Sequence, residues 1–213
     1  MLRRPALKPL HWIGLSGLAL ALTLAACMLS TPQRTRSADA ALLAAAGEFC
    51  VVAPPTPYDP KSDLSLYQAR PVPVDARCPV CGMFPARSPD WAAQIIFNNG
   101  DAQFFDSPLT LFLYLQDVGR YTRGRHASEI AVSYVKDASS GDWIGAHQAF
   151  YVSGSNALGP MRAGNLPAFS NAAAAQRFAS ARGGVLLLAS QITAKRLQDL
   201  NGERPHAHAK APG

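Results

Sequence analysis

WAAQIIFNNGDAQFFDSPLTLFLYLQD, residues 91–117, indicates a ββα unit. Residues 91–97 suit a first strand, and the NNGD sequence at 98–101 supplies residues that tolerate the left-handed backbone of a tight hairpin turn. Residues 102–105 are then expected to return as a second strand. Asp106 and Ser107 are suitable N-cap residues, and the Pro and apolar residues that follow predict a helix reaching Asp117.

The second half of the chain repeats this layout. We expect strands at residues 130–134, 149–152, 166–169 and 185–188, and helices at 172–182 and 190–200. Residues 168–171 align with 104–107, because each block places an aromatic residue at a strand end and a capping residue before a helix. The sequence therefore predicts an α+β fold that consists of two similar ββα-type modules with small antiparallel sheets.

The N-terminal residues indicate a secreted lipoprotein. A basic segment, residues 1–8, precedes an uncharged apolar stretch, 12–26, that is shorter than the roughly 20 residues of a transmembrane helix. The stretch ends in LAAC, residues 24–27, which resembles the lipobox cut by the bacterial lipoprotein signal peptidase. This resemblance implies a cleaved signal peptide, 1–26, and a membrane anchor of lipid chains on Cys27. The protein would then face the periplasm, and Met28 favours the outer membrane slightly over the inner.

The remaining segments divide the chain further. Residues 27–63 are expected to form a tether and a proline-rich extended segment, because prolines recur from position 54 to position 73 and exclude long helices. The α+β domain is expected at 64–200, with modules at about 75–122 and 128–200, and a disordered tail at 201–213.

Composition and charge exclude several function classes. The formal net charge is +6, but Arg3, Arg4 and Lys8 lie in the leader, so the rest of the chain carries only half of it. No basic segment interleaved with aromatic residues is present, and we therefore expect no nucleic-acid partner. The sequence also offers no catalytic triad, paired carboxylates or phosphate-binding glycine loop, so we expect no enzymatic activity.

The main chemical signal is the segment RCPVCGM, residues 77–83. Two thiols, Cys78 and Cys81, and the thioether of Met83 fall within six residues, and Gly82 lets the backbone turn between them. Soft sulfur ligands select Cu(I) over harder cations. The segment therefore predicts a Cu(I) site.

Two other interpretations of the cysteine pair stay open. In one, the protein is a periplasmic thiol-disulfide oxidoreductase in which Cys78 attacks and Cys81 resolves the mixed disulfide. In the other, the two cysteines form a structural disulfide and bind no metal. Redox chemistry and a disulfide need the two thiols but not Met83, so the methionine distinguishes the copper site from both.

More distant residues are candidate ligands too. Met161 lies in a turn-like Gly-Pro-Met sequence, where methionine is ordinarily a gap-filling residue. His147 offers an imidazole, although a single histidine beside an apolar strand is more often a packed or hydrogen-bonded residue.

Several blocks of this sequence resemble the NosL family of nitrous oxide reductase accessory lipoproteins. The matching blocks occur in order between about residues 75 and 192: RCPVCGM at 77–83, WAAQI at 91–95, FDSP at 105–108, YVSGS at 151–155 and GPM at 159–161. The resemblance implies a fold of two similar ββα-type modules. It also implies a periplasm-facing Cu(I) chaperone that supplies copper for the maturation of nitrous oxide reductase, with a membrane transporter complex as partner.

The resemblance implies a ligand set as well. Cys81 and Met83 would hold Cu(I), and the Gly-Pro-Met block makes Met161 a further candidate. Cys78 departs from the many members that have a single cysteine before the Gly-Met pair. It is either a third sulfur ligand or the partner of Cys81 or Cys50 in a disulfide, and members with two cysteines could serve a copper enzyme other than nitrous oxide reductase.

Overall fold

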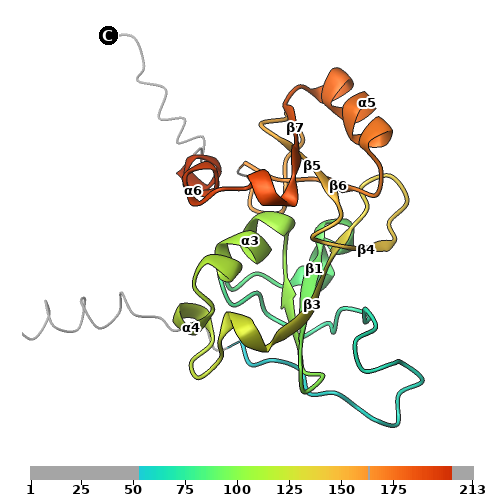
Figure 1. Ribbon diagram of the computed structural model, residues 1–213, viewed down its shortest axis with the longest axis vertical. Helices are drawn as coiled ribbons and strands as arrows, with labels where there is room; N and C mark the ends of the chain where they lie inside the picture. The colour runs from blue at the N-terminus through green and yellow to red at the C-terminus, as the bar shows by residue number, and fades with distance from the viewer. Residues whose placement is uncertain (1–52, 163, 203–213) are drawn as a thin grey trace, which may run out of the picture. The chain divides into compact units, whose positions relative to one another are not determined.

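The computed structural model describes residues 53–162 and 164–202. Labels follow Figure 1. The strands are β1 (Ala93–Phe97), β2 (Ala102–Phe105), β3 (Ile130–Lys136), β4 (Trp143–Gly145), β5 (Phe150–Ser153), β6 (Ala168–Phe169) and β7 (Val185–Leu188), and the α-helices are α3 (Pro108–Gln116), α4 (Val118–Tyr121), α5 (Ala172–Arg182) and α6 (Ala194–Gly202). Short 3-10 turns lie at Pro85–Arg87, Pro89–Trp91, Ala127–Glu129 and Ala189–Gln191.

The first sheet is built on the expected ββα unit. Its strand order is β2-β1-β3-β4, and all neighbours are antiparallel. The turn between β1 and β2 contains Gly100 at a φ of 88°, where a side chain would collide with Leu66 and Tyr58. Helix α3 follows at once, and the Ser107 hydroxyl caps it by accepting a hydrogen bond from the backbone N–H of Thr110.

The second sheet repeats the topology of the first. Its order is β6-β5-β7, with α5 between β6 and β7, just as α3 lies between β2 and β3 in the order β2-β1-β3. Asn171 caps α5 by accepting from the N–H of Ala174, at the position equivalent to Ser107. The prediction of an α+β fold with two similar ββα-type modules is confirmed.

The boundary between the two modules lies further along the chain than we expected. We placed a module boundary at about residues 122–128, but β3 and β4 pair into the first sheet. The repeated unit is therefore ββαβ rather than ββα, and the second copy starts at β5. Strand β4 and helix α4 were not expected, and α6 continues through Gly202, two residues into the segment predicted as a disordered tail.

Helix α3 lies at the centre of the fold, between the two sheets, whereas α5 covers the outer face of the second sheet (Figure 1). The central hydrophobic core joins both sheets, α3 and α6. Its largest members are fully buried: Phe97, Phe105, Leu111, Tyr114, Tyr151, Leu166 and Leu197. A separate cluster beneath α5 contains Val152, Phe169 and three alanines of the helix.

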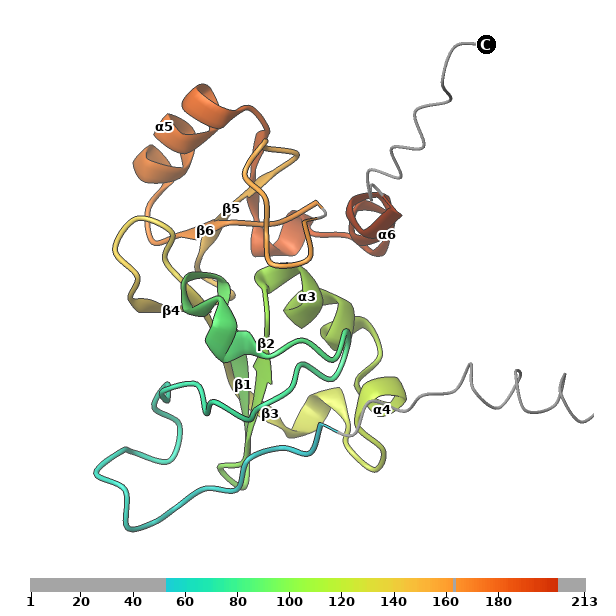
Figure 2. The same cartoon turned by 180° about the vertical axis from the view of Figure 1, so that it is seen from behind.

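The proline-rich segment covers the remaining face of the first sheet. It contains no helix or regular strand between residues 57 and 84, and it passes along the lower module in Figure 2. Thr56 exchanges two backbone hydrogen bonds with Ala102, and Gln94 exchanges two with the backbone of Arg70. Packing therefore begins before Leu64, where we expected the domain to start. Both faces of β1 are covered, which is why all five of its residues are buried.

The described ranges contain no helix that is long and apolar enough to cross a bilayer. The expected signal peptide at 1–26, Cys27, Cys50, most of the tether and residues 203–213 lie outside the described residues.

Candidate metal centre

The cysteine segment forms a tight turn that precedes β1. The backbone N–H of Cys78 donates to the carbonyl of Met83 over 2.8 Å, and the N–H of Gly82 donates back to the carbonyl of Cys78 over 2.9 Å. Gly82 has a φ of 75°, a conformation that strongly favours glycine. The turn is therefore closed by its own backbone, and both thiols are held on one short loop.

The loop brings its two thiols to the start of α3. The Sγ atoms of Cys78 and Cys81 and a carboxylate oxygen of Asp106 all lie within 4.8 Å of one another. Cys78 is completely buried, Asp106 is 1% exposed, and Cys81 is half-buried. Among the described His, Cys, Asp and Glu side chains, these three are the one group placed to share a metal ion.

The two thiols are electronically different. Burial raises the pKa of the Cys78 thiol, but hydrogen bonds from the Cys81 thiol and from the backbone N–H groups of Asp106 and Cys81 bring it below its ordinary value. The same thiol-to-thiol hydrogen bond raises the pKa of Cys81, and burial adds to this effect. The hydrogen bond between the two sulfur atoms therefore favours the charged form at Cys78 over the charged form at Cys81.

A groove opens beside Cys81. It has a volume of about 660 Å³ and is lined by residues of α3, α4 and α6, with Cys81 and Met161 both on its wall. The groove thus brings together a thiol and a thioether that are 80 positions apart in sequence. Cys78 does not line it, so Cys81 is the thiol that meets this groove.

The other candidate ligands are placed differently. The Met83 carbonyl closes the cysteine turn, and the residue is 37% exposed. His147 is exposed and does not belong to the thiol and carboxylate group.

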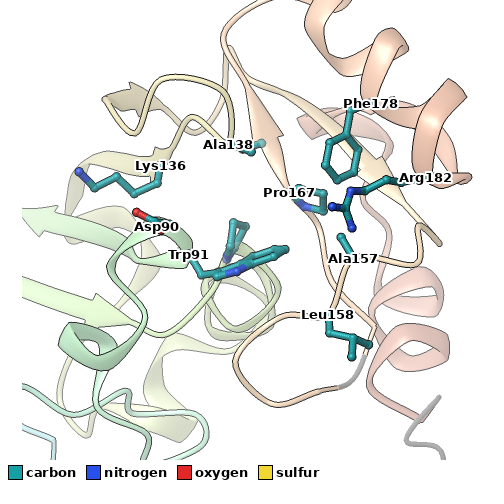
Figure 3. A pocket seen from close by; sticks show the side chains of 11 residues that line it. Asp90, Trp91, Lys136, Ala138, Ala157, Leu158, Pro167, Phe178 and Arg182 are labelled. Carbon is teal, nitrogen blue, oxygen red and sulfur yellow. The ribbon is translucent and has the colours of Figure 1, made fainter.

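A second cavity lies between the modules, on the side of Trp91 and α5 (Figure 3). It has a volume of about 270 Å³, and Trp91, Phe178 and Arg182 contribute to its wall. Neither described cysteine lines it. Its lining offers no soft ligand, so the thiol site and this cavity are separate features.

Sequence reasoning missed Asp106 as a site residue. We assigned Asp106 and Ser107 together to helix capping, but Ser107 alone caps α3, and the Asp106 carboxylate accepts a hydrogen bond from the Thr110 hydroxyl over 2.6 Å. The sequence did contain one signal. Two capping residues in succession exceed what one helix start requires, which leaves one of them available for another role.

Comparisons with known proteins identify relatives of this chain. A family model described as NosL matches residues 70–197, which include the cysteine turn, Asp106 and Met161. The copper-binding lipoprotein NosL of Achromobacter cycloclastes is 33% identical over 124 residues, covering 53% of this chain and 61% of that protein. The chain therefore spans about three fifths of the length of this curated relative.

A solved structure shares the fold. The crystal structure of the copper chaperone NosL from Shewanella denitrificans aligns with a TM-score of 0.51 and 24% sequence identity, over 61% of this chain and 98% of that chain. The arrangement of two small antiparallel sheets around a central helix is thus found in a known protein.

Proposed function

This chain belongs to the NosL family, and on that premise we propose that it is a lipid-anchored Cu(I) chaperone that faces the periplasm. Copper is its cargo, held by Cys78 and Cys81 and passed on by ligand exchange, without a catalytic step. Met83 and Met161 are the proposed additional thioether ligands. The recipient that we propose is a copper enzyme, in the first place nitrous oxide reductase, reached with a membrane transporter complex.

The observation that carries this proposal is the placement of two free thiols within 4.8 Å of each other on one closed turn. Cu(I) is a soft ion that two thiolates bind well, and a preformed pair avoids much of the entropic cost of bringing the ligands together. The backbone N–H groups that stabilise thiolate at Cys78 favour metal binding as well, because the thiolate is the ligand.

The groove supplies a route for transfer. Cys78 is buried, so an incoming ligand reaches the copper on the side of Cys81. Met161 lines the same groove and offers a neutral thioether, a weaker donor than a thiolate. We propose that copper leaves through this groove when a partner's sulfur ligand replaces Met161 and then Cys81.

The membrane anchor is a separate part of the proposal. It rests on the LAAC sequence at residues 24–27, and the Achromobacter relative is named a lipoprotein. We expect cells to incorporate labelled fatty acid into the wild-type protein and not into a Cys27→Ala variant. Equal labelling of both proteins would contradict the anchor at Cys27.

The thiol-disulfide oxidoreductase is less compatible with the geometry. An attacking thiolate must reach a disulfide of another protein, but Cys78, the thiol that the surroundings favour as thiolate, has no exposed surface. In addition, the turn after Cys81 leads to Met83 and Phe84 rather than into a helix. These two features favour metal binding over disulfide exchange.

The test is an anaerobic Cu(I) titration in competition with a chromophoric chelator. The full chain is used with Cys27 and Cys50 replaced by Ser, so that Cys78 and Cys81 are the remaining thiols. We expect stoichiometric binding that Cys78→Ser and Cys81→Ser each weaken at least about a hundredfold, equivalent to about 2.7 kcal/mol. Binding that survives both substitutions, or no competition with the chelator, would contradict the proposal.

A further inference from the structure

Two arginines share one aromatic ring beside the cysteine turn. The guanidinium carbon of Arg77 lies 4.2 Å from the centre of the Phe84 ring, and that of Arg87 lies 4.6 Å from it. Together the two distances keep the guanidinium carbons less than about 9 Å apart. Both arginines are exposed, Phe84 is half-buried, and the neighbouring Met83 is 37% exposed. These four residues form what we call the Phe84 patch.

Neither guanidinium group is paired with a carboxylate in the part of the chain that the structure describes. The ion pairs there use Arg125 and Lys195. The acidic residues nearest in sequence are Asp75 and Asp90, and Asp90 lines the second cavity instead. Two like charges held close together repel each other, and an anion that binds both removes this repulsion. The arrangement is therefore suited to an anionic partner.

The two arginines are partly ordered before any partner arrives. A guanidinium group that rests on an aromatic ring has already lost part of its rotamer freedom, so it loses less on binding. Arg77 is held a second time, because its Nη1 donates to the carbonyl of Gly82 over 3.3 Å. The backbone of Arg87 is tied to the ring residue, because its N–H donates to the carbonyl of Phe84 over 3.0 Å. The patch is thus both exposed and prearranged.

The composition of the patch favours a protein as the partner. Arginine, aromatic residues and methionine are enriched at protein interfaces, and the planar guanidinium group binds a carboxylate through two parallel hydrogen bonds. An anionic membrane is a poorer match, because such surfaces are recognised by clusters of about 4–8 basic residues. The patch contains only two arginines, so an acidic protein surface fits it better.

The patch is part of the same turn as the thiols. Arg77 directly precedes Cys78, and Gly82, whose carbonyl accepts from Arg77, directly follows Cys81. A protein bound to the two arginines therefore lies against the turn that carries both thiols. Opposite charges on the two surfaces also raise the rate at which the proteins meet.

We propose that the Phe84 patch docks an acidic surface of the protein that exchanges copper with this chain, and that Arg77 and Arg87 bind its carboxylates. The identity of the cargo rests on the proposed function. The preference for an acidic protein surface follows from the patch alone and is tested without copper.

The first test uses a fluorescently labelled hexaglutamate peptide as the acidic probe. Anisotropy at low salt measures its affinity for the full chain with Cys27 and Cys50 replaced by Ser, and for the patch variant Arg77→Gln/Arg87→Gln. The matched control is Lys61→Gln/Arg177→Gln, which removes the same charge from two exposed residues outside the patch. Circular dichroism and thermal melts establish that each variant is folded.

We expect the patch variant to weaken peptide binding at least about fivefold and the control variant to change it by less than about twofold. Arg77→Lys/Arg87→Lys keeps the charge but not the planar groups, and it should restore part of the affinity. No loss in the patch variant, or an equal loss in the control variant, would overturn the proposal. Unchanged peptide binding with lost binding to phosphatidylglycerol vesicles would overturn it in favour of a lipid surface.

Copper capture tests whether docking at the patch affects transfer. The Cu(I)-loaded proteins are mixed with two phenanthroline chelators that have the same donor atoms, one disulfonated and one neutral. We expect the patch variant to slow capture by the disulfonated chelator at least about threefold at low salt, and capture by the neutral chelator by less than about twofold. Unchanged rates, or equal slowing with both chelators, would overturn the proposal. A chain that binds the peptide through the patch but binds no copper would instead contradict the chaperone function alone.

Discussion

Helices α3 and α5 hold equivalent positions in the two ββαβ modules, but their surroundings differ. Counting from the N-caps, Leu111 of α3 corresponds to Ala175 of α5, and both residues are fully buried. Helix α3 packs large side chains against two sheets, whereas α5 packs small ones against a single sheet. Helix α3 is therefore buried because the second module packs against the side of the helix that faces away from the first sheet.

The residues just before the two helices differ in the same way. Asp106 precedes α3 and faces the cysteine turn, while Ser170 precedes α5 and donates its backbone N–H to Asp137 of the first module. No turn with cysteines precedes β5, where the sequence is AHQA at 146–149. The two modules share a topology, but both thiols and Asp106 lie in the first module. The second module contributes Met161, which lines the groove beside Cys81.

The largest expected effect is a loss of folding stability when a buried side chain of the central helix α3 is shortened. Leu111→Ala should lower the free energy of unfolding by about 3 kcal/mol, because it opens a cavity between two sheets that cannot both collapse onto it. The reverse exchange, Ala175→Leu, should cost about 1–3 kcal/mol by overpacking the space under α5. Urea denaturation measures both. A loss below about 1 kcal/mol for Leu111→Ala would show that α3 is less confined than its burial indicates.

The contact between the modules should depend on pH through Asp137. Burial opposes the charge of this carboxylate, but hydrogen bonds from Ser170 and from nearby backbone N–H groups outweigh it and lower its pKa below the ordinary value. The stabilisation is therefore complete well above pH 4 and is lost as the pH falls through the lowered pKa.

Asp137→Asn should accordingly cost about 2 kcal/mol at neutral pH, the size expected for charged hydrogen bonds. The gap between wild type and variant should narrow below about pH 4, where the wild-type carboxyl begins to take up a proton. Denaturation curves across the acid range measure the gap. A constant difference at all pH values would mean that the charge at this position has no role.

The sequence predicted the first module well because its signals are local. The hairpin at 98–101, the Ser107 cap and the helix after Pro108 each depend on neighbouring residues, and β1, β2 and α3 are found where they were expected. The shared cap position likewise allowed the duplication to be recognised. Strand β4 escaped prediction because its three residues are defined by pairing with β3, a contact that no short pattern reveals.

The site could be predicted only in part for the same reason. The soft pair of Cys78 and Cys81 is local in sequence, whereas Asp106 joins it through the packing of the turn against α3. The groove that relates Cys81 to Met161 likewise requires α6 and the Gly-Pro-Met turn to lie beside α3. In β3, Val132 and Tyr134 are half-buried on the side of the proline-rich segment, while Val135 belongs to the central core.

A smaller effect is expected at the thioethers. Met161→Leu and Met83→Leu preserve size and remove the sulfur, so each should weaken Cu(I) binding by about three- to tenfold, equivalent to about 0.7–1.4 kcal/mol. The chelator competition of the cysteine variants measures this change. If neither exchange alters the affinity, the methionines fill space and the two thiols bind copper alone.

The smallest expected effect tests whether the second cavity contributes to Cu(I) binding. Arg182 lines the second cavity (Figure 3), and neither described cysteine contributes to that lining. Arg182→Ala should leave Cu(I) affinity within about twofold of the wild type, since no soft ligand lies there. A larger loss in the same titration would show that this cavity and the cysteine turn are coupled.

X-ray absorption at the copper edge of the Cu(I)-loaded, reduced protein reports directly whether the two cysteines hold the copper. We expect a first shell of two or three sulfur atoms that loses one sulfur in Cys81→Ser and one in Cys78→Ser. A first shell of nitrogen and oxygen atoms, or a sulfur shell that neither substitution changes, would contradict a copper site built on the cysteine turn of the first module.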